Sequence, residues 1–144
     1  MYSLRTDSFL QTLRSAGIPD PKKNFFLIPQ DNEINIRALW NEIAALRQKI
    51  TGAFCYSDSI AMHLLLHLNS LGIRVPQDFS ICGFGDMFAD RFSLTTVQLF
   101  PEKLGFAACT RLIDLIKNPD SPAVNVLSPV ELVNPHSTVA SAKM

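Results

Sequence analysis

Two short polar segments each follow a run of apolar residues, and their side chains are of the kinds that bind small molecules. Ser57 and Asp58 come directly after the apolar run 53–56, and Gly85 and Asp86 come after a second such run. Each run has the length and the residue types of a buried strand. Ligands of open α/β sheets bind outside the carboxyl ends of the strands. The pattern therefore predicts a small-molecule site around Ser57 and Gly85.

Asp58 also marks the start of a predicted helix. A carboxylate there accepts hydrogen bonds from the free backbone N–H groups of the first turn, so we expect Asp58 to be the N-cap of helix 59–70. The hydroxyl of Ser57 donates and accepts hydrogen bonds, whereas Gly85 has no side chain and is also explained as a strand-end glycine.

Arg5 stands at the start of the first predicted helix, 4–16. A cation is poorly placed there, because a helix N-terminus already carries partial positive charge. The rigid fork of guanidinium donors suits hydroxyls and carboxylates. Two interpretations stay open: Arg5 binds a ligand, or it is solvated near a chain end.

The residues that could catalyse a reaction or hold a metal form no recognisable set. His63 and His67 have i,i+4 spacing, but no Glu follows His63 and no third ligand is evident. His136 has no nucleophile partner that the sequence identifies. No Gly-x-Ser-x-Gly motif, phosphate loop or dinucleotide fingerprint occurs. We expect a binding protein and not an enzyme, with no metal and no cofactor.

The cysteines and the charge balance further narrow the class of protein. Cys55 and Cys82 lie inside apolar runs, so we expect inert core thiols in a reducing cytoplasm, and Cys109 has no second ligand at metal spacing. Lys and Arg total 13, as do Asp and Glu, and no basic cluster occurs. This balance disfavours direct binding to DNA or to an anionic membrane. No apolar run approaches the roughly 20 residues of a membrane helix, and the first residues do not resemble a signal peptide.

The apolar periodicity predicts alternating helices and strands over one domain. The helices are expected at 4–16, from Asp31 or Asn32 through Ile36, Leu39, Trp40, Ile43 and Leu46, at 59–70 and at 101–117; the strands are expected at 25–28, 53–56, 79–84, 94–100 and within 124–133. Gly17 should end the first helix, and the residues from Asn134 look like a loose tail. This alternation is typical of an α/β fold with a mostly parallel sheet.

Several motifs in this order resemble the effector-binding core of the lactose-repressor/galactose-repressor (LacI/GalR) family of transcriptional regulators. The matching segments are Arg-Thr-Asp-Ser-Phe at 5–9, Ser-Asp at 57–58, Leu-Gly-Ile at 71–73, Val-Pro-Gln-Asp-Phe-Ser at 75–80, Gly-Phe-Gly-Asp at 83–86, Leu-Thr-Thr-Val at 94–97 and Pro-Glu-Lys-Leu-Gly at 101–105. The order and spacing of these motifs match the family over almost the whole chain.

The resemblance implies a three-layer α/β/α fold, the C-terminal subdomain of a periplasmic-binding-protein-like domain in truncated form. Residues 1–134 would form this fragment and residues 135–144 a tail. Helix 101–117 would belong with the first subdomain, which is missing together with a central strand and the helix-turn-helix. We expect the apolar face of that helix to lack its usual partner.

The resemblance also implies roles for the candidate site residues. Arg5 would reach into the effector cleft, and Asp86 would remain from a pair of acidic residues. Ser57 replaces an Asn, and Gly85 replaces the first Asp of the pair, so two polar anchors are lost. We therefore expect an effector that is bulkier or less polar than the usual sugar, or no effector.

Helix 59–70 is apolar nearly all round, although a helix on one side of a sheet needs only one apolar stripe. Family dimers pair through the corresponding helix, which implies that Met62 and Leu66 form a homodimer interface. Deep burial of the whole helix is the alternative.

The function implied is the effector-binding and dimerisation part of a LacI/GalR-type regulator. DNA would be bound only through a domain absent from this chain, and effector binding would act by hinge closure. The alternative is a sugar-binding protein of a transport system with the same fold. An enzyme on this scaffold is a third option, because fold alone does not determine function.

Overall fold

The computed structural model describes residues 4–27, 33–46, 49–86, 93–133 and 136–140. The chain divides into two compact units, Met1–Asn41 and Glu42–Met144, which are described in turn. The boundary falls inside α2 (Glu33–Ala45).

The first unit contains α1 (Leu4–Ser15), which matches the helix predicted from the sequence. Leu10 is its buried residue. Gly17 ends the helix as expected: it has a φ of 77°, and the N–H of Ile18 donates to the Leu13 carbonyl at 3.0 Å. Because residues with a Cβ rarely adopt this left-handed conformation, glycine suits the position.

The strand expected at 25–28 is wrong for its described part. A short 3-10 helix, η1 (Pro21–Asn24), precedes it, and the N–H of Phe25 donates to the Lys22 carbonyl at 3.2 Å. Phe25 to Leu27 then have no regular secondary structure, and Ile28 lies outside the described residues. The turn uses the backbone donor of Phe25 that a strand ladder would need.

The apolar face predicted for the second helix is confirmed in its described part. Trp40 and Ile43 are buried and Leu39 is half-buried in α2. Asp31 and Asn32, the expected caps, lie outside the described residues.

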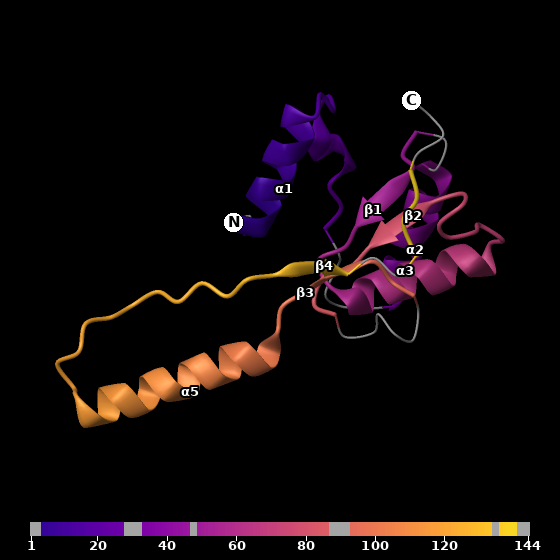
Figure 1. Cartoon of the computed structure of the whole chain (residues 1–144). Helices are drawn as coiled ribbons and strands as arrows, with labels where there is room; N and C mark the ends of the chain where they lie inside the picture. The colour runs from indigo at the N-terminus through magenta and orange to yellow at the C-terminus, as the bar shows by residue number, and fades with distance from the viewer. Residues whose placement is uncertain (1–3, 28–32, 47–48, 87–92, 134–135, 141–144) are drawn as a thin grey trace. The chain divides into compact units, whose positions relative to one another are not determined.

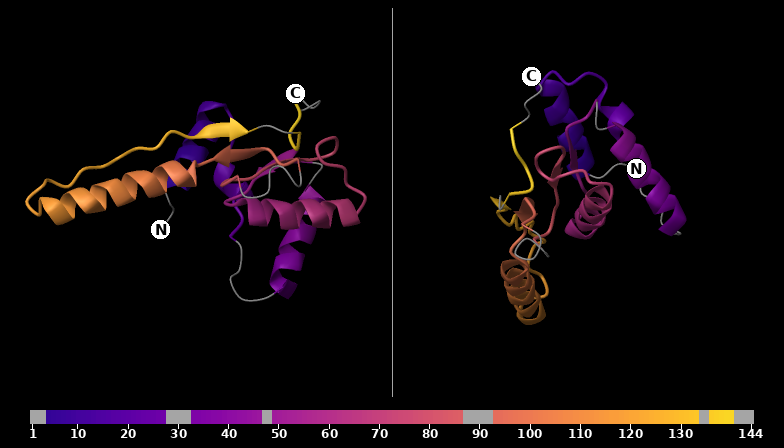
Figure 2. Two further views of the ribbon diagram at one scale, coloured as in Figure 1. Left: turned by 60° about the horizontal axis from the view of Figure 1, so that its bottom comes forward. Right: turned by 90° about the vertical axis from the view of Figure 1, so that its right-hand side faces the viewer.

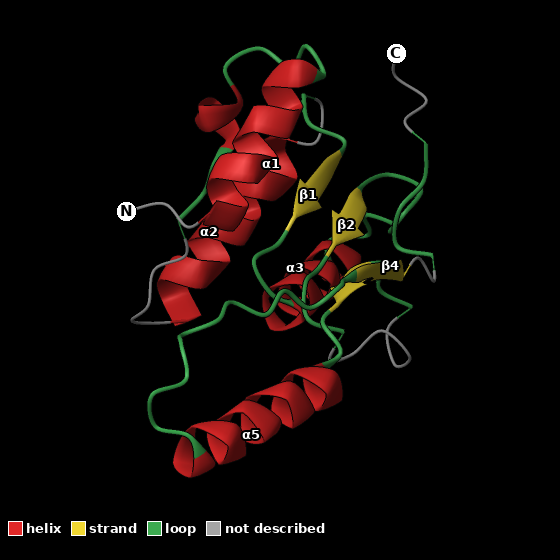
Figure 3. Ribbon diagram, turned by 60° about the vertical axis from the view of Figure 1, so that its left-hand side comes forward, coloured by secondary structure: helices red, strands yellow, loops and turns green. Residues whose placement is uncertain are grey.

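The described residues of the second unit include four short strands. β1 (Gly52–Phe54) and β2 (Ser80–Cys82) are parallel, with Ala53 opposite Ile81, while β3 (Thr96–Gln98) and β4 (Glu131–Val133) are antiparallel. Figure 3 shows these strands in yellow.

Hydrogen bonds continue from β2 to the β3 segment. The N–H groups of Gly83 and Gly85 donate to the carbonyls of Thr95 and Val97, at 2.8 and 2.9 Å, and Cys82 forms a parallel bridge with Thr95. The expected α/β fold with a mostly parallel set of strands is thereby confirmed.

The core of this unit lies between β2 and α3 (Asp58–Ser70), which packs against it. Ala61, Leu64, Leu65 and Leu68 form the buried face of the helix. On the strand side, the apolar side chains without exposed surface belong to Phe79, Ile81 and Leu94. The Val75–Pro76 peptide bond in the connection from α3 to β2 is cis.

Helix α5 (Pro101–Lys117) has the bounds predicted from the sequence, yet none of its residues is buried. Figures 1 and 2 show it running away from the strands, with residues 118–130 returning in an extended path to β4. Exposed apolar side chains on these two segments belong to Leu104, Phe106, Leu112, Ile113, Ile116, Val124, Val126, Leu127 and Val130. Among the described residues, none therefore buries the apolar face of α5.

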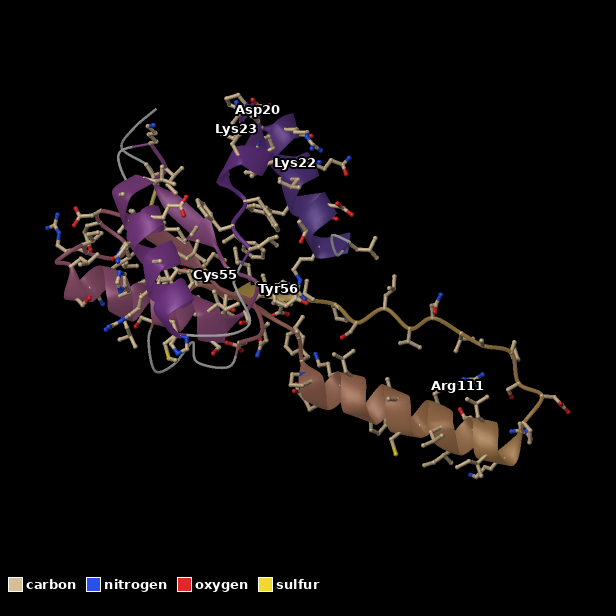
Figure 4. All side chains as sticks on the ribbon, turned by 180° about the vertical axis from the view of Figure 1, so that it is seen from behind. Asp20, Lys22, Lys23, Cys55, Tyr56 and Arg111 are labelled. Carbon is tan, nitrogen blue, oxygen red and sulfur yellow. The ribbon has the colours of Figure 1, made fainter. Side chains whose placement is uncertain are left out.

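Local contacts stabilise α5 in place of core packing. Pro101 begins the helix, where its missing N–H costs nothing, and the ammonium of Lys103 lies 4.0 Å from the centre of the Phe100 ring. The guanidinium of Arg111 donates to the Pro122 carbonyl, which ties the helix to the returning segment (Figure 4).

The segment from His136 to Val139 is attached to the sheet and is not the loose tail that the sequence predicts. The N–H of Ile81 donates to the Ser137 carbonyl at 2.8 Å. The buried Ser137 hydroxyl accepts from the Thr95 N–H and donates to the Ile81 carbonyl, both at 2.6 Å. Ser137 therefore connects β2 to the residue that precedes β3.

Burial predicts stability losses of very different size for two phenylalanine truncations. Phe79 has no exposed surface, whereas Phe106 on α5 is 77% exposed. Phe79→Ala should lower the free energy of unfolding by about 3 to 5 kcal/mol, while Phe106→Ala should change it by less than about 0.5 kcal/mol. Urea denaturation of both variants measures the difference. A loss of comparable size for Phe106→Ala would mean that α5 packs against a core.

Ser137→Ala should destabilise the chain because it leaves a buried N–H and a buried carbonyl without their partner. Each such group costs about 1 to 3 kcal/mol. Ser70→Ala is the matched control, since that exposed hydroxyl only donates to the nearby His67 carbonyl. Thermal unfolding of the two variants should show a lower midpoint for Ser137→Ala alone. Equal midpoints would contradict the attachment of the segment.

Candidate functional site

The ends of β1 and β2 lie next to each other and carry the polar segments singled out in the sequence. The N–H of Cys55 donates to the Cys82 carbonyl at 2.7 Å, and the N–H of Asp58 donates to the Phe84 carbonyl at 3.1 Å. These two bonds hold the segment with Ser57 against the segment with Gly85. The structure thus brings Ser57, Gly85 and Asp86 to one edge of the strands.

Ser57, and not Asp58, is the N-cap of α3, which corrects the sequence prediction. Ser57 has extended backbone angles, and its Oγ accepts the N–H of Ile60 at 3.4 Å. Asp58 is the first helical residue. Its negative charge is favourable there because the helix N-terminus is partially positive. The Ser57 hydroxyl keeps its proton, so it can still donate to a ligand.

The carboxylate of Asp58 is buried and turned toward β3. It has no exposed surface, and its Oδ1 accepts the hydroxyl proton of Thr96 at 2.5 Å. A Cβ added to Gly83 would lie 2.2 Å from the same oxygen, so only glycine leaves room for it. Sequence reasoning missed the roles of Thr96 and Gly83. The pair of threonines beside an apolar run was the signal that could have pointed to Thr96.

The turn after β2 has two consecutive residues with positive φ. Gly85 has a φ of 124° and Asp86 a φ of 58°. The first value is a conformation that residues with a Cβ rarely adopt, which explains a glycine at this position. The N–H of Asp86 donates to the Thr96 Oγ1 at 3.4 Å. Both turn residues are half-buried, so part of their surface remains accessible.

Aromatic residues directly precede Ser57 and Gly85 along the chain, and sequence reasoning missed them. Tyr56 is 60% exposed between β1 and α3 (Figure 4). Phe54 and Phe84 meet edge to face, with ring centres 6.5 Å apart and planes at 86°. Such rings supply apolar surface beside the polar groups of the turn.

Cys55 has the properties expected of an inert core thiol. Burial, with smaller contributions from Cys82 and Asp58, raises the pKa of the Cys55 thiol to about 12. Burial, followed by the charge of Asp58, also raises the pKa of Cys82. Because the thiolate is the reactive form, these raised pKa values disfavour nucleophilic chemistry at both cysteines.

The remaining candidates lie on helices α1 and α3. Arg5 is half-buried in α1 and belongs to the first unit, so its convergence on Ser57 and Gly85 stays a prediction. On α3, Leu66 is 49% exposed and Met62 is half-buried. The second stripe of α3 is thus accessible in the isolated chain.

The described ranges contain neither a candidate metal site nor a candidate membrane span. Among those residues, no group of three or more His, Cys, Asp and Glu side chains is arranged to hold a metal ion. No described helix combines the length and the hydropathy needed to cross a lipid bilayer.

Curated relatives of this chain are bacterial repressors. The chain is 31% identical over 138 residues to the HTH-type transcriptional repressor PurR of Photorhabdus laumondii, covering 94% of this chain and 40% of the relative. It is 34% identical over 125 residues to the PurR of Pectobacterium atrosepticum, covering 82% of this chain and 36% of that repressor. The chain thus spans about two fifths of the length of these relatives.

Solved structures similar to this chain include a LacI-type transcription regulator from Bifidobacterium animalis. Its TM-score is 0.81 at 24% identity, over 95% of this chain and 50% of that chain, which shows the fold. A LacI family transcriptional regulator from Enterococcus faecium, with bound ribose, has a TM-score of 0.77 at 26% identity, over 93% of this chain and 50% of that one.

The model of one domain family covers nearly the whole sequence. It matches residues 2–138 and describes a periplasmic binding protein-like domain. The parallel strands β1 and β2, the helix between them and the polar segments at their carboxyl ends agree with this match. The chain belongs to the periplasmic binding protein-like domain family.

Proposed function

We propose that this chain is the effector-binding and dimerisation part of a LacI/GalR-type transcriptional regulator. The observation that carries the proposal is the meeting of Ser57, Gly85 and Asp86 at the carboxyl ends of two parallel strands. Ligands of such sheets bind at that edge. The names of the related repressors and regulators support a role in transcription over one in transport or catalysis.

The effector would be a small metabolite bound by a few polar groups and by apolar surface. The Ser57 hydroxyl and the Asp86 carboxylate would contact its polar atoms, and Arg5 would complete the set from the first unit. Tyr56 would contribute exposed ring surface. Since Gly85 offers no side chain, a ligand can approach the backbone closely there.

The protein would act in the cytoplasm, and DNA would be contacted by another part of a longer regulator. The charges of this chain are balanced, with 13 basic and 13 acidic side chains, which supports that division. Two copies would pair through α3, where Met62 and Leu66 form a stripe that the core of the unit leaves accessible.

Effector binding should raise the thermal midpoint of the chain. The probes are D-ribose, sucrose, nucleobases and amino acids, each tested by differential scanning fluorimetry. A compound at about 100 times its Kd should raise the midpoint by about 5 to 10 °C. Asp86→Ala and Arg5→Ala should remove the shift.

Two matched variants control for charge alone: Asp120→Ala, at an exposed position after α5, and Arg14→Ala, in the last turn of α1. They should keep the full shift. The proposal is wrong if no compound raises the midpoint, or if the shift persists in Asp86→Ala.

Charging the accessible stripe of α3 should convert a dimer to a monomer. Met62→Glu with Leu66→Lys places opposite charges at i,i+4, which supports the helix while it repels an apolar partner. Sedimentation velocity should show a dimer for the unchanged chain and a monomer for this variant.

Leu112→Glu with Ile116→Lys provides the same charges at the same spacing on α5 and should leave the dimer intact. A monomeric unchanged chain, or an α3 variant that still dimerises, would refute pairing through α3.

A further inference from the structure

The Thr96 hydroxyl connects two parts of the candidate site that are far apart in sequence. Its Oγ1 donates to the Asp58 carboxylate at 2.5 Å and accepts the backbone N–H of Asp86 at 3.4 Å. Thr96 has no exposed surface, so water does not compete for these bonds. One hydroxyl therefore joins the first residue of α3 to the turn after β2.

Asp58 is held from two sides. Its backbone N–H donates to the Phe84 carbonyl at 3.1 Å, and its side chain, without exposed surface, accepts from Thr96. A carboxylate removed from water is costly unless its oxygens accept hydrogen bonds. The position of the α3 N-terminus is therefore tied to β2 and to β3 at the same time.

Gly83 makes this arrangement possible. A Cβ at this residue would lie 2.2 Å from the Asp58 Oδ1 and 3.0 Å from the Leu94 Cδ2. Both atoms belong to buried side chains. Any larger residue at position 83 must displace the carboxylate from Thr96.

We propose that Thr96 and Asp58 are positioning residues, which hold the Gly85–Asp86 turn in its positive-φ conformation and couple it to α3. A non-glycine residue with positive φ, such as Asp86, persists when its surroundings hold it. A ligand that moves the Asp86 backbone would shift the hydrogen bond to Thr96, and through Asp58 the N-terminus of α3. Coupling of a ligand to α3 rests on the proposed function, whereas the positioning itself does not.

The direct test is amide hydrogen exchange of the 144-residue chain, followed by NMR without any ligand. Thr96→Val keeps the shape of the side chain and removes the hydroxyl. The Asp86 amide should exchange about three- to tenfold faster in this variant, relative to the Ile81 amide, which reports global opening. Thr96→Ser restores the hydroxyl and should restore the protection of Asp86.

A second variant disrupts the contact between Asp58 and Thr96 without altering Thr96. Gly83→Ala should displace the Asp58 carboxylate and expose the Asp86 amide to a similar degree. Gly105→Ala is its control, because a Cβ there meets nothing within 4 Å. Unchanged relative exchange of Asp86 in Thr96→Val or in Gly83→Ala would overturn the proposal, as would failure of Thr96→Ser to restore protection.

Measurements with the candidate ligands distinguish this proposal from the proposed function. The wild-type chain could respond to none of the sugars, nucleobases and amino acids while the Asp86 amide still loses protection in Thr96→Val. This result would contradict the effector site and support the positioning role. If a compound raises the thermal midpoint of Thr96→Val as much as that of Thr96→Ser, the proposed coupling between the ligand and α3 is contradicted.

Discussion

The buried hydrogen bond between Asp58 and Thr96 is the interaction on which the geometry of the strand ends depends. A carboxylate without exposed surface requires donors that stay in place, and the Thr96 hydroxyl on β3 is such a donor for Asp58. Three features follow from it. Position 83 must be glycine, α3 must begin beside β2, and the turn after β2 must run past Thr96. The candidate site is therefore a product of packing between elements distant in sequence.

Helix α5 shows the opposite situation, in which local forces determine an element without any core. Pro101 at its start and a sequence rich in good helix formers are sufficient for its bounds. Its apolar side chains stay exposed, and exposed apolar patches of this kind mark surfaces that contact another protein segment.

Sequence patterns predicted the helices better than the strands and the caps. The helices at 4–16, 59–70 and 101–117 were found because helical periodicity and stop residues such as Gly17 are local signals. The strand expected at 25–28 failed because a 3-10 turn at Pro21 uses the Phe25 donor. The loose tail was a wrong prediction for a similar reason: Ser137 is fixed by bonds to Ile81 and Thr95, which no local pattern reveals.

The sequence by itself determined the α/β class, the family, and the two polar segments that follow β1 and β2. These depend on the order of residues along the chain, and the carboxyl ends of parallel strands meet at one edge in any such fold. Only the tertiary structure decided what each side chain does there. Ser57 caps α3 while Asp58 turns inward, because a hydroxyl donor from β3 lies within 2.5 Å of the Asp58 carboxylate. Thr96 is separated from Asp58 by 38 positions, so the choice between capping and burial depended on a contact that only folding creates.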